Sequence, residues 1–167
     1  MPFPDLPAGR QGRLAPQRPA CQDARMPHPA PRAWHEHRLR VRYGETDQMG
    51  VVYHANYLVY MEEGRTRLMD AKGCSYAELE REGWALVVRK AELRYRAPAR
   101  YDEELVVRTA VDRLGGASLS FRYEVARRSD GALLAEGMTE LACVDRRADP
   151  SRPALLPERI RELLAPS

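Results

Sequence analysis

Residues 57–73 have the sequence YLVYMEEGRTRLMDAKG, and this stretch decides the fold class. Its apolar or small residues recur every three or four positions, which is the spacing of an α-helix with one buried face. Gly73 is a typical residue at the end of such a helix. The spacing therefore predicts one long helix that packs a single face against another layer. The residues of that face are Tyr57, Tyr60, Met61, Gly64, Leu68 and Ala71.

The period of the hydrophobic pattern changes after this helix. Ser75 and Glu78 have the spacing of a capping box, which predicts a second, short helix that ends at Gly83. Beyond Gly83, apolar residues alternate with more polar ones, and this period of two is typical of strands with one buried face. The alternating positions are Leu93 and Tyr95, then Leu105, Val107, Thr109 and Val111, then Leu119, Phe121, Tyr123 and Val125, and the turns between runs contain Pro98, Gly115-Gly116 and Asp130-Gly131.

The end of the chain completes the predicted pattern. Residues 132–144 form a last strand-like segment, and Pro157-Glu158 would open a short terminal helix. A helix with one apolar face needs a partner layer, and an antiparallel sheet needs one face covered. We therefore expect the α+β class, with an antiparallel β-sheet packed on one long α-helix.

The segment just before the long helix holds the chemically informative residues. Residues 42–57 have the sequence RYGETDQMGVVYHANY and follow the strand-forming residues Leu39 and Val41. Asp47 and His54 therefore flank a connection between a strand and a helix, where catalytic residues are often found. An aspartate is ordinarily ionised at neutral pH, so Asp47 can act as a general base toward water or attack a carbonyl directly. The unpaired backbone amides at the helix start, near His54, can receive a developing oxyanion.

This motif resembles that of the hotdog-fold thioesterases, specifically the 4-hydroxybenzoyl-CoA thioesterase and YbgC-type acyl-CoA thioesterase family. In that family an Asp, a Gly and a Tyr or His recur with this spacing. The resemblance implies that the sheet wraps around one long central helix and that two protomers join their sheets edge to edge. It also implies a homodimer or homotetramer with its active sites at the subunit interface. Looser matches follow in order within residues 36–164, at residues 88–95, 98–103, 116–119 and 143–145.

The resemblance also implies roles for individual residues. Asp47 and His54 would be catalytic, with a backbone amide at His54 as the oxyanion donor. Gly50, Val51 and Tyr57 would bind the substrate, and Gly50 would let the backbone turn tightly beside it. The remaining residues expected to bind substrate, through coenzyme A, are Arg89, Lys90 and Ser118.

Charge and cysteine content argue against other classes of protein. The formal charge of +3 arises within residues 1–32, which contain five Arg and two acids, whereas the remainder holds 22 basic and 22 acidic residues. A nucleic-acid surface usually concentrates a basic excess, so we expect no nucleic-acid partner. No apolar run approaches the roughly 20 residues that span a bilayer. Three widely spaced cysteines, Cys21, Cys74 and Cys143, favour free thiols in the cytoplasm over a disulfide framework or a metal site.

Residues 1–32 differ in composition from the rest of the chain. They hold eight of the thirteen prolines and show no hydrophobic period, which predicts a disordered tail rich in Pro and Arg. Met26 offers a later start, in which case residues 1–25 would be a start-site extension. We expect residues 33–165 to form one hotdog thioesterase domain.

These observations favour an acyl-CoA thioesterase that releases a free acid and coenzyme A and needs no cofactor. One alternative is a hotdog dehydratase or hydratase, which would act on hydroxyacyl thioesters by proton transfer. Another is a non-catalytic module that binds acyl-CoA as a scaffold. Asp47 before the helix favours hydrolysis, because a pure binder gains little from a carboxylate beside a polyanionic ligand. The acyl chain, and the choice between coenzyme A and acyl carrier protein, stay open.

Overall fold

The computed structural model describes residues 33–165. The tail expected over residues 1–32, and the alternative start at Met26, lie outside the described residues. None of the helices within residues 33–165 is long and apolar enough to cross a membrane.

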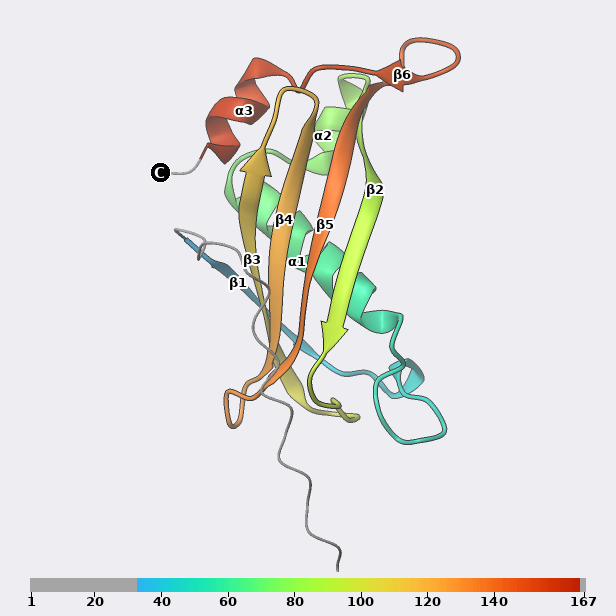
Figure 1. The fold of residues 1–167 in the computed structure, drawn as a ribbon, viewed down its shortest axis with the longest axis vertical. Coiled ribbons are helices and arrows are strands. Elements are labelled where there is room, and N and C mark those ends of the chain that lie inside the picture. The colour runs from blue at the N-terminus through green and yellow to red at the C-terminus, as the bar shows by residue number, and fades with distance from the viewer. Residues whose placement is uncertain (1–32, 166–167) are drawn as a thin grey trace, which may run out of the picture.

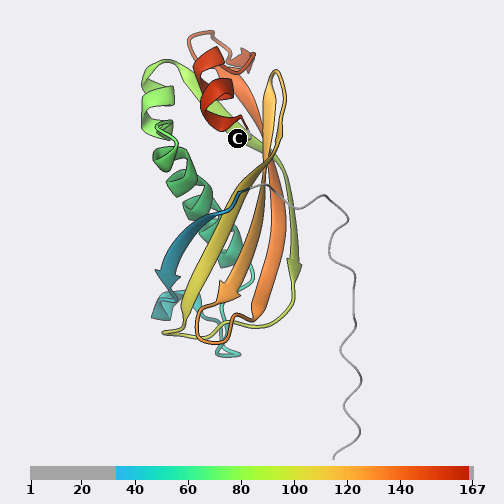
Figure 2. The same cartoon turned by 90° about the vertical axis from the view of Figure 1, so that its left-hand side faces the viewer.

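The architecture is one curved antiparallel sheet that wraps around one long helix, α1 (Figures 1 and 2). The strands lie in the order β1-β3-β4-β5-β2, and the short β6 also pairs with β5. Neighbouring strands are antiparallel throughout. This arrangement confirms the expected α+β class. The elements are β1 (His35–Arg40), the 3-10 helix η1 (Tyr43–Glu45), α1 (Asn56–Ala71), α2 (Tyr76–Arg81), β2 (Trp84–Tyr95), β3 (Glu104–Leu114), β4 (Ser118–Arg127), β5 (Leu133–Asp145), β6 (Arg152–Pro153) and α3 (Glu158–Leu164).

Helix α1 buries the predicted face with one exception. Ala71, the last helical residue, is exposed, whereas Arg65 and Met69 are buried. Both Ala71 and Lys72 are exposed, so the buried face ends at Met69. Gly73 ends the helix as predicted: its φ is +72°, and its amide and that of the next residue each donate to a carbonyl of the last turn at 2.9 Å. The buried residues of α1 are Tyr57, Tyr60, Met61, Gly64, Arg65, Leu68 and Met69.

The second helix forms without the predicted capping box. Ser75 is the N-cap residue of α2, but its side chain makes no capping hydrogen bond. Gly83, just beyond the helix, has a φ of +89° and begins the turn into β2. Pro157 precedes α3, so the predicted terminal helix is also present.

The alternating strands supply the other half of the core. The predicted inward residues of β4 are all buried, and in β3 only Val111 is partly exposed. At the sheet edge, Tyr95 ends β2 and stays 47% exposed because β2 has a strand neighbour on one side only. Cys74 and Cys143 are buried free thiols, as expected from their spacing, and they pack as small core residues.

Candidate active site

The connection between β1 and α1 folds back on itself around Asp47. The amide of Gly50 donates to the carbonyl of Asp47, and the amide of Asp47 donates to the carbonyl of Val51, both at 2.9 Å. Gly50 has a φ of +71°, so this position needs the conformational freedom of glycine. Val52 is buried, and its amide donates to the carbonyl of Ala99 at 2.9 Å. The loop is therefore a defined tight turn fixed to the segment after β2.

The Asp47 carboxylate is oriented within this turn. Its Oδ1 accepts a hydrogen bond from the amide of Met49 at 2.8 Å. Its Oδ2 accepts none from the residues that the structure describes, and the side chain is partly exposed. One oxygen thus fixes the group, and the other is available to water or to a ligand.

Glu45 anchors the loop of Asp47 to the start of α1. The sequence motif did not assign this residue to the site. The residue is 8% exposed, and its carboxylate accepts hydrogen bonds from the Arg42 amide at 2.8 Å, from Arg42 Nε at 2.7 Å and from the Tyr60 hydroxyl at 2.8 Å. Its carbonyl accepts from the Tyr53 amide at 2.9 Å and from Asn56 Nδ2 at 2.8 Å. Burial acts to raise the pKa of Glu45, but the donors of Arg42 and Tyr60 outweigh it and hold the pKa below its ordinary value.

The first turn of α1 presents backbone donors beside this loop. Ala55 is the N-cap residue, and the Asn56 amide donates to the Tyr53 carbonyl at 2.9 Å. The amides of His54 and Ala55 make no hydrogen bond within residues 33–165. The His54 side chain is exposed, and its ring centroid lies 4.2 Å from that of Tyr53. The helix start therefore offers two donors and a partial positive charge to a ligand.

A cavity of about 350 Å³ brings four of the predicted residues together. Gly50 adjoins it through its neighbour Val51 in the turn. The Tyr57 hydroxyl accepts from the Ala99 amide at 3.2 Å, and the Tyr57 ring packs edge to face on Tyr95, with centroids 5.4 Å apart. Tyr95 in turn donates its hydroxyl hydrogen to the His54 carbonyl at 2.9 Å. The lining residues are Asp47, Val51, Val52, His54, Tyr57, Tyr95, Arg96, Ala97 and Pro98.

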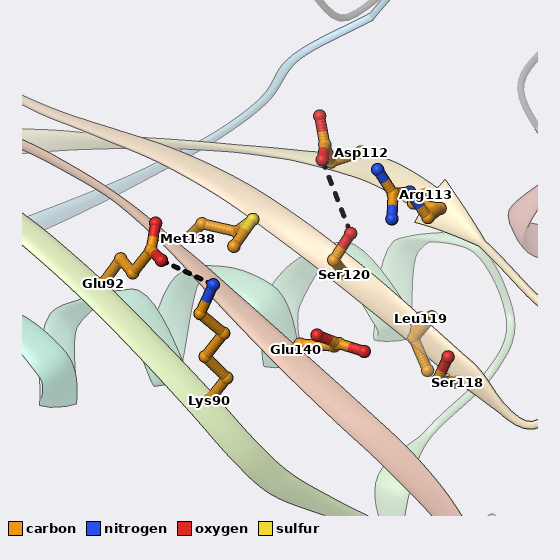
Figure 3. Close-up of a pocket in the computed structure, with 9 residues that line it drawn as sticks. All are labelled: Lys90, Glu92, Asp112, Arg113, Ser118, Leu119, Ser120, Met138 and Glu140. Carbon is orange, nitrogen blue, oxygen red and sulfur yellow. Dashed lines mark hydrogen bonds and ion pairs between the residues drawn. The ribbon is translucent and has the colours of Figure 1, made fainter. Parts of the chain in front are cut away.

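The residues predicted to contact coenzyme A lie elsewhere. Lys90 and Ser118 line a second cavity of about 270 Å³, on the face of the sheet that points away from α1 (Figure 3). Lys90 forms an ion pair with Glu92 at 2.5 Å, and Arg89 forms one with Glu140 at 2.9 Å. Their contact with coenzyme A stays a prediction, because the structure does not bring them into the cavity of Asp47.

The second cavity has a mixed charge. Its cationic side chains are Lys90 and Arg113, whereas Glu92, Asp112 and Glu140 are anionic. A polyanion such as coenzyme A would meet more negative than positive groups there. Among the described residues, no group of three or more His, Cys, Asp or Glu side chains could hold a metal ion.

Comparisons with known proteins agree with this fold. Residues 41–164 match the model of the thioesterase-like superfamily. The putative acyl-CoA thioesterase YneP of Bacillus subtilis is 39% identical over 65% of this chain and 78% of its own length. The acyl-CoA thioester hydrolase YbgC of Escherichia coli is 38% identical over 64% of this chain and 79% of its own. The crystal structure of the hypothetical protein TT1821 from Thermus thermophilus superposes with a TM-score of 0.73 at 41% identity, over 80% of this chain and 96% of that one.

These matches confirm the resemblance drawn from the motif. The family model covers the loop of Asp47, helix α1 and the whole sheet except β1. The chain belongs to the thioesterase-like superfamily and has its hotdog fold.

Proposed function

We propose that the protein hydrolyses acyl-CoA thioesters to a free acid and coenzyme A, with Asp47 delivering the oxygen. The observation that carries this proposal is the shared cavity of Asp47 and His54, beside the unpaired amides at the start of α1. A carboxylate and fixed oxyanion donors are the groups that attack on a thioester carbonyl requires. The acyl-CoA class is supported by the names of the YneP and YbgC relatives.

Two routes use these groups. In the general-base route, Asp47 takes a proton from water while the water oxygen bonds to the carbonyl carbon. The carbonyl oxygen becomes an oxyanion that accepts from the amides of His54 and Ala55. Collapse breaks the carbon–sulfur bond, and the thiolate of coenzyme A leaves and takes up a proton. In the nucleophilic route, the free oxygen of Asp47 attacks the carbon, the thiolate leaves, and water hydrolyses the mixed anhydride.

The alternatives explain less of the site. A dehydratase must move a proton on the acyl chain, and His54 would have to be held in place to do so. His54 is exposed, lies beside the ring of Tyr53 and has no carboxylate partner among the described residues. A pure binding module would leave unexplained an aspartate whose one oxygen is anchored and whose other oxygen is available. Hydrolysis uses both features.

The remaining predictions concern the assembly and its setting. We propose that two protomers pair along β2, so that each active site lies at an interface and the Arg89, Lys90 and Ser118 of one protomer could meet coenzyme A bound by the other. We also propose a reducing cytoplasmic setting. The free, unpaired state of Cys74 and Cys143 supports this setting.

The first experiment measures thiol release from aromatic, short-chain and long-chain acyl-CoAs by the wild type and an Asp47→Asn variant. Asparagine keeps the size of the side chain and can still accept from the Met49 amide, so the turn should persist. We expect kcat to fall at least about 100-fold, because the group that delivers oxygen is lost.

An Asp70→Asn variant is the matched control, because Asp70 is an exposed aspartate near the other end of α1. It should keep the wild-type rate. Equal turnover by wild type and Asp47→Asn would remove Asp47 from the mechanism. A wild type that binds acyl-CoA without turning it over would instead favour the binding module.

A further inference from the structure

Tyr95 links the edge of the sheet to the start of the long helix. It is the last residue of β2, and its hydroxyl donates to the carbonyl oxygen of His54 at 2.9 Å, across 41 positions of sequence. Both residues line the cavity of Asp47. The hydrogen bond therefore connects two elements at the place where we propose that the oxyanion forms.

The carbonyl that Tyr95 binds belongs to the same peptide unit as the amide of Ala55. In a planar trans peptide the C=O and N–H bonds point in opposite directions, so fixing one fixes the other. The amide of Ala55 has no acceptor among the described residues, and neither has that of His54. The direction of such an N–H follows its peptide plane, and a hydrogen bond to the carbonyl on the other side limits the rotation of that plane.

We propose that Tyr95 is a positioning residue that orients the His54–Ala55 peptide so that its amide points at the carbonyl oxygen of the bound thioester. This inference rests on the proposed thioesterase function and adds a residue to it. Preorganised donors stabilise an oxyanion because they need no reorientation during the reaction. Tyr95 supplies that preorganisation from the sheet.

The surroundings of Tyr95 suit this task. Its ring packs edge to face on Tyr57, which is buried and is itself fixed by the Ala99 amide at 3.2 Å. Partial burial raises the pKa of Tyr95, so its hydroxyl stays protonated at neutral pH and remains a donor. The donor is thus held on one side by an aromatic neighbour and on the other by the peptide that it orients.

The test compares Tyr95→Phe with Tyr101→Phe. Phenylalanine keeps the ring contact with Tyr57 and removes only the hydroxyl. Tyr101 is 56% exposed, does not line the cavity and packs edge to face on Tyr43, so it controls for loss of a tyrosine hydroxyl. We expect kcat of Tyr95→Phe to fall about 10-fold and KM to stay within twofold of the wild type. This fall in kcat is smaller than the roughly 100-fold or more that follows the loss of an oxyanion donor itself. Tyr101→Phe should match the wild type.

Two further readouts separate positioning from other roles. A thioether analogue of acyl-CoA lacks the carbonyl oxygen, so it should inhibit the wild type and Tyr95→Phe equally. In ¹H–¹⁵N spectra of the free protein, the Ala55 amide signal should shift or broaden in Tyr95→Phe and stay in place in Tyr101→Phe. The spectral readout does not depend on turnover.

Each contrary result has a distinct meaning. An unchanged kcat or an unchanged Ala55 signal in Tyr95→Phe overturns the positioning role. Weaker inhibition by the thioether overturns it too, because Tyr95 would then contact the ligand itself. If Asp47→Asn is inactive while Tyr95→Phe is fully active, only this inference fails. If the wild type releases no thiol from acyl-CoA, the proposed function fails, and the role of Tyr95 in it fails as well.

Discussion

Glu45 is the residue through which the loop of Asp47 is joined to α1. Its carboxylate binds the Tyr60 hydroxyl one turn into the helix, and its carbonyl binds Asn56 at the helix start. The three donors to the carboxylate replace the water that burial removes. Asp47 lies two residues further on, so the position of its carboxylate depends on this anchor.

We expect Glu45→Gln to destabilise the fold by about 1–3 kcal/mol at neutral pH, because it removes a buried charge that accepts three hydrogen bonds. The pKa of Glu45 is lowered in the folded state, so its contribution is present above the unfolded pKa of about 4.3 and is lost as the pH falls through the folded value. Urea unfolding at pH 7 and near pH 3 should therefore show a large difference from wild type that shrinks in acid.

Glu80→Gln is the matched control for this prediction. Glu80 is exposed on α2, where its ion pair with Arg146 spans 3.7 Å, so its loss should change stability by less than about 0.5 kcal/mol. A stability difference between Glu45→Gln and wild type that grows on acidification would contradict a lowered pKa for Glu45 in the folded state.

The sequence predicted the site residues that lie close together along the chain and missed those that reach it from a distance. Asp47, Gly50 and His54 belong to one short motif, so their proximity needs no tertiary information. Tyr95 reaches the same cavity only because β2 ends beside the helix start. Its alternation with Leu93 predicted an ordinary strand residue, and no local pattern could show which end of the strand meets the helix.

At the scale of elements, α1 and β3 approach each other closely. A Cβ atom on Gly64 would lie 2.6 Å from Thr109 Oγ1 and 2.7 Å from Val107 Cγ1, both below ordinary van der Waals contact. Glycine in mid-helix costs helical propensity, so its presence at this position is explained by the contact. The buried stripe of α1 can therefore lie directly on the sheet.

We expect Gly64→Ala to destabilise the protein by about 1–2 kcal/mol, because an added methyl group would overpack the contact between α1 and β3. This cost exceeds the gain in helix propensity from alanine, which is at most about 1 kcal/mol. Thermal or urea unfolding measures the difference. Gly44→Ala is the control, since a Cβ on Gly44 meets nothing within 4 Å. A Gly64→Ala variant that is as stable as wild type would show that the helix can shift away from β3 at no cost.

Periodicity predicted the type of the main helix and of the long strands, but not the short elements η1 and β6 or the arrangement of the elements. Steps of three and four in α1 and of two in β3 and β4 reflect which side chains face the core, so these three elements could be predicted from their own residues. The pairing of β1 with β3, and the position of β2 at the opposite edge, depend on contacts between elements that alternation does not encode. Alternation with Leu93 and Leu119 already indicates that Lys90 and Ser118 lie on the outer face, but the residues of other strands that they meet there depend on the strand register.

At the scale of the whole molecule, the outer edge of β2 is the part of the sheet where we expect a partner to bind. This strand has 12 residues and pairs only with β5 among the described residues, so its other edge leaves backbone groups unpaired. Val87 and Val88 in its middle are 50% and 42% exposed. The opposite edge, β1, has only six residues and carries charged side chains at Glu36, Arg38 and Arg40. The exposed part of β2 also carries charged side chains at Arg89, Lys90 and Arg94, but its length alone makes it an edge of the kind that proteins normally cover.

We expect the wild type to be at least a dimer at micromolar concentration in sedimentation equilibrium, and Val88→Lys to shift it toward monomer, because a charge would be buried where two β2 strands meet. The variant should also lose kcat/KM, since the proposed active sites lie at that interface. Val59→Lys is the matched control: Val59 is 50% exposed, but on α1. It should leave the dimer intact. If two dimers form a tetramer by packing their helix faces together, Val59→Lys should dissociate that tetramer into dimers. A monomeric wild type, or a dimer broken by Val59→Lys but not by Val88→Lys, would rule out pairing along β2.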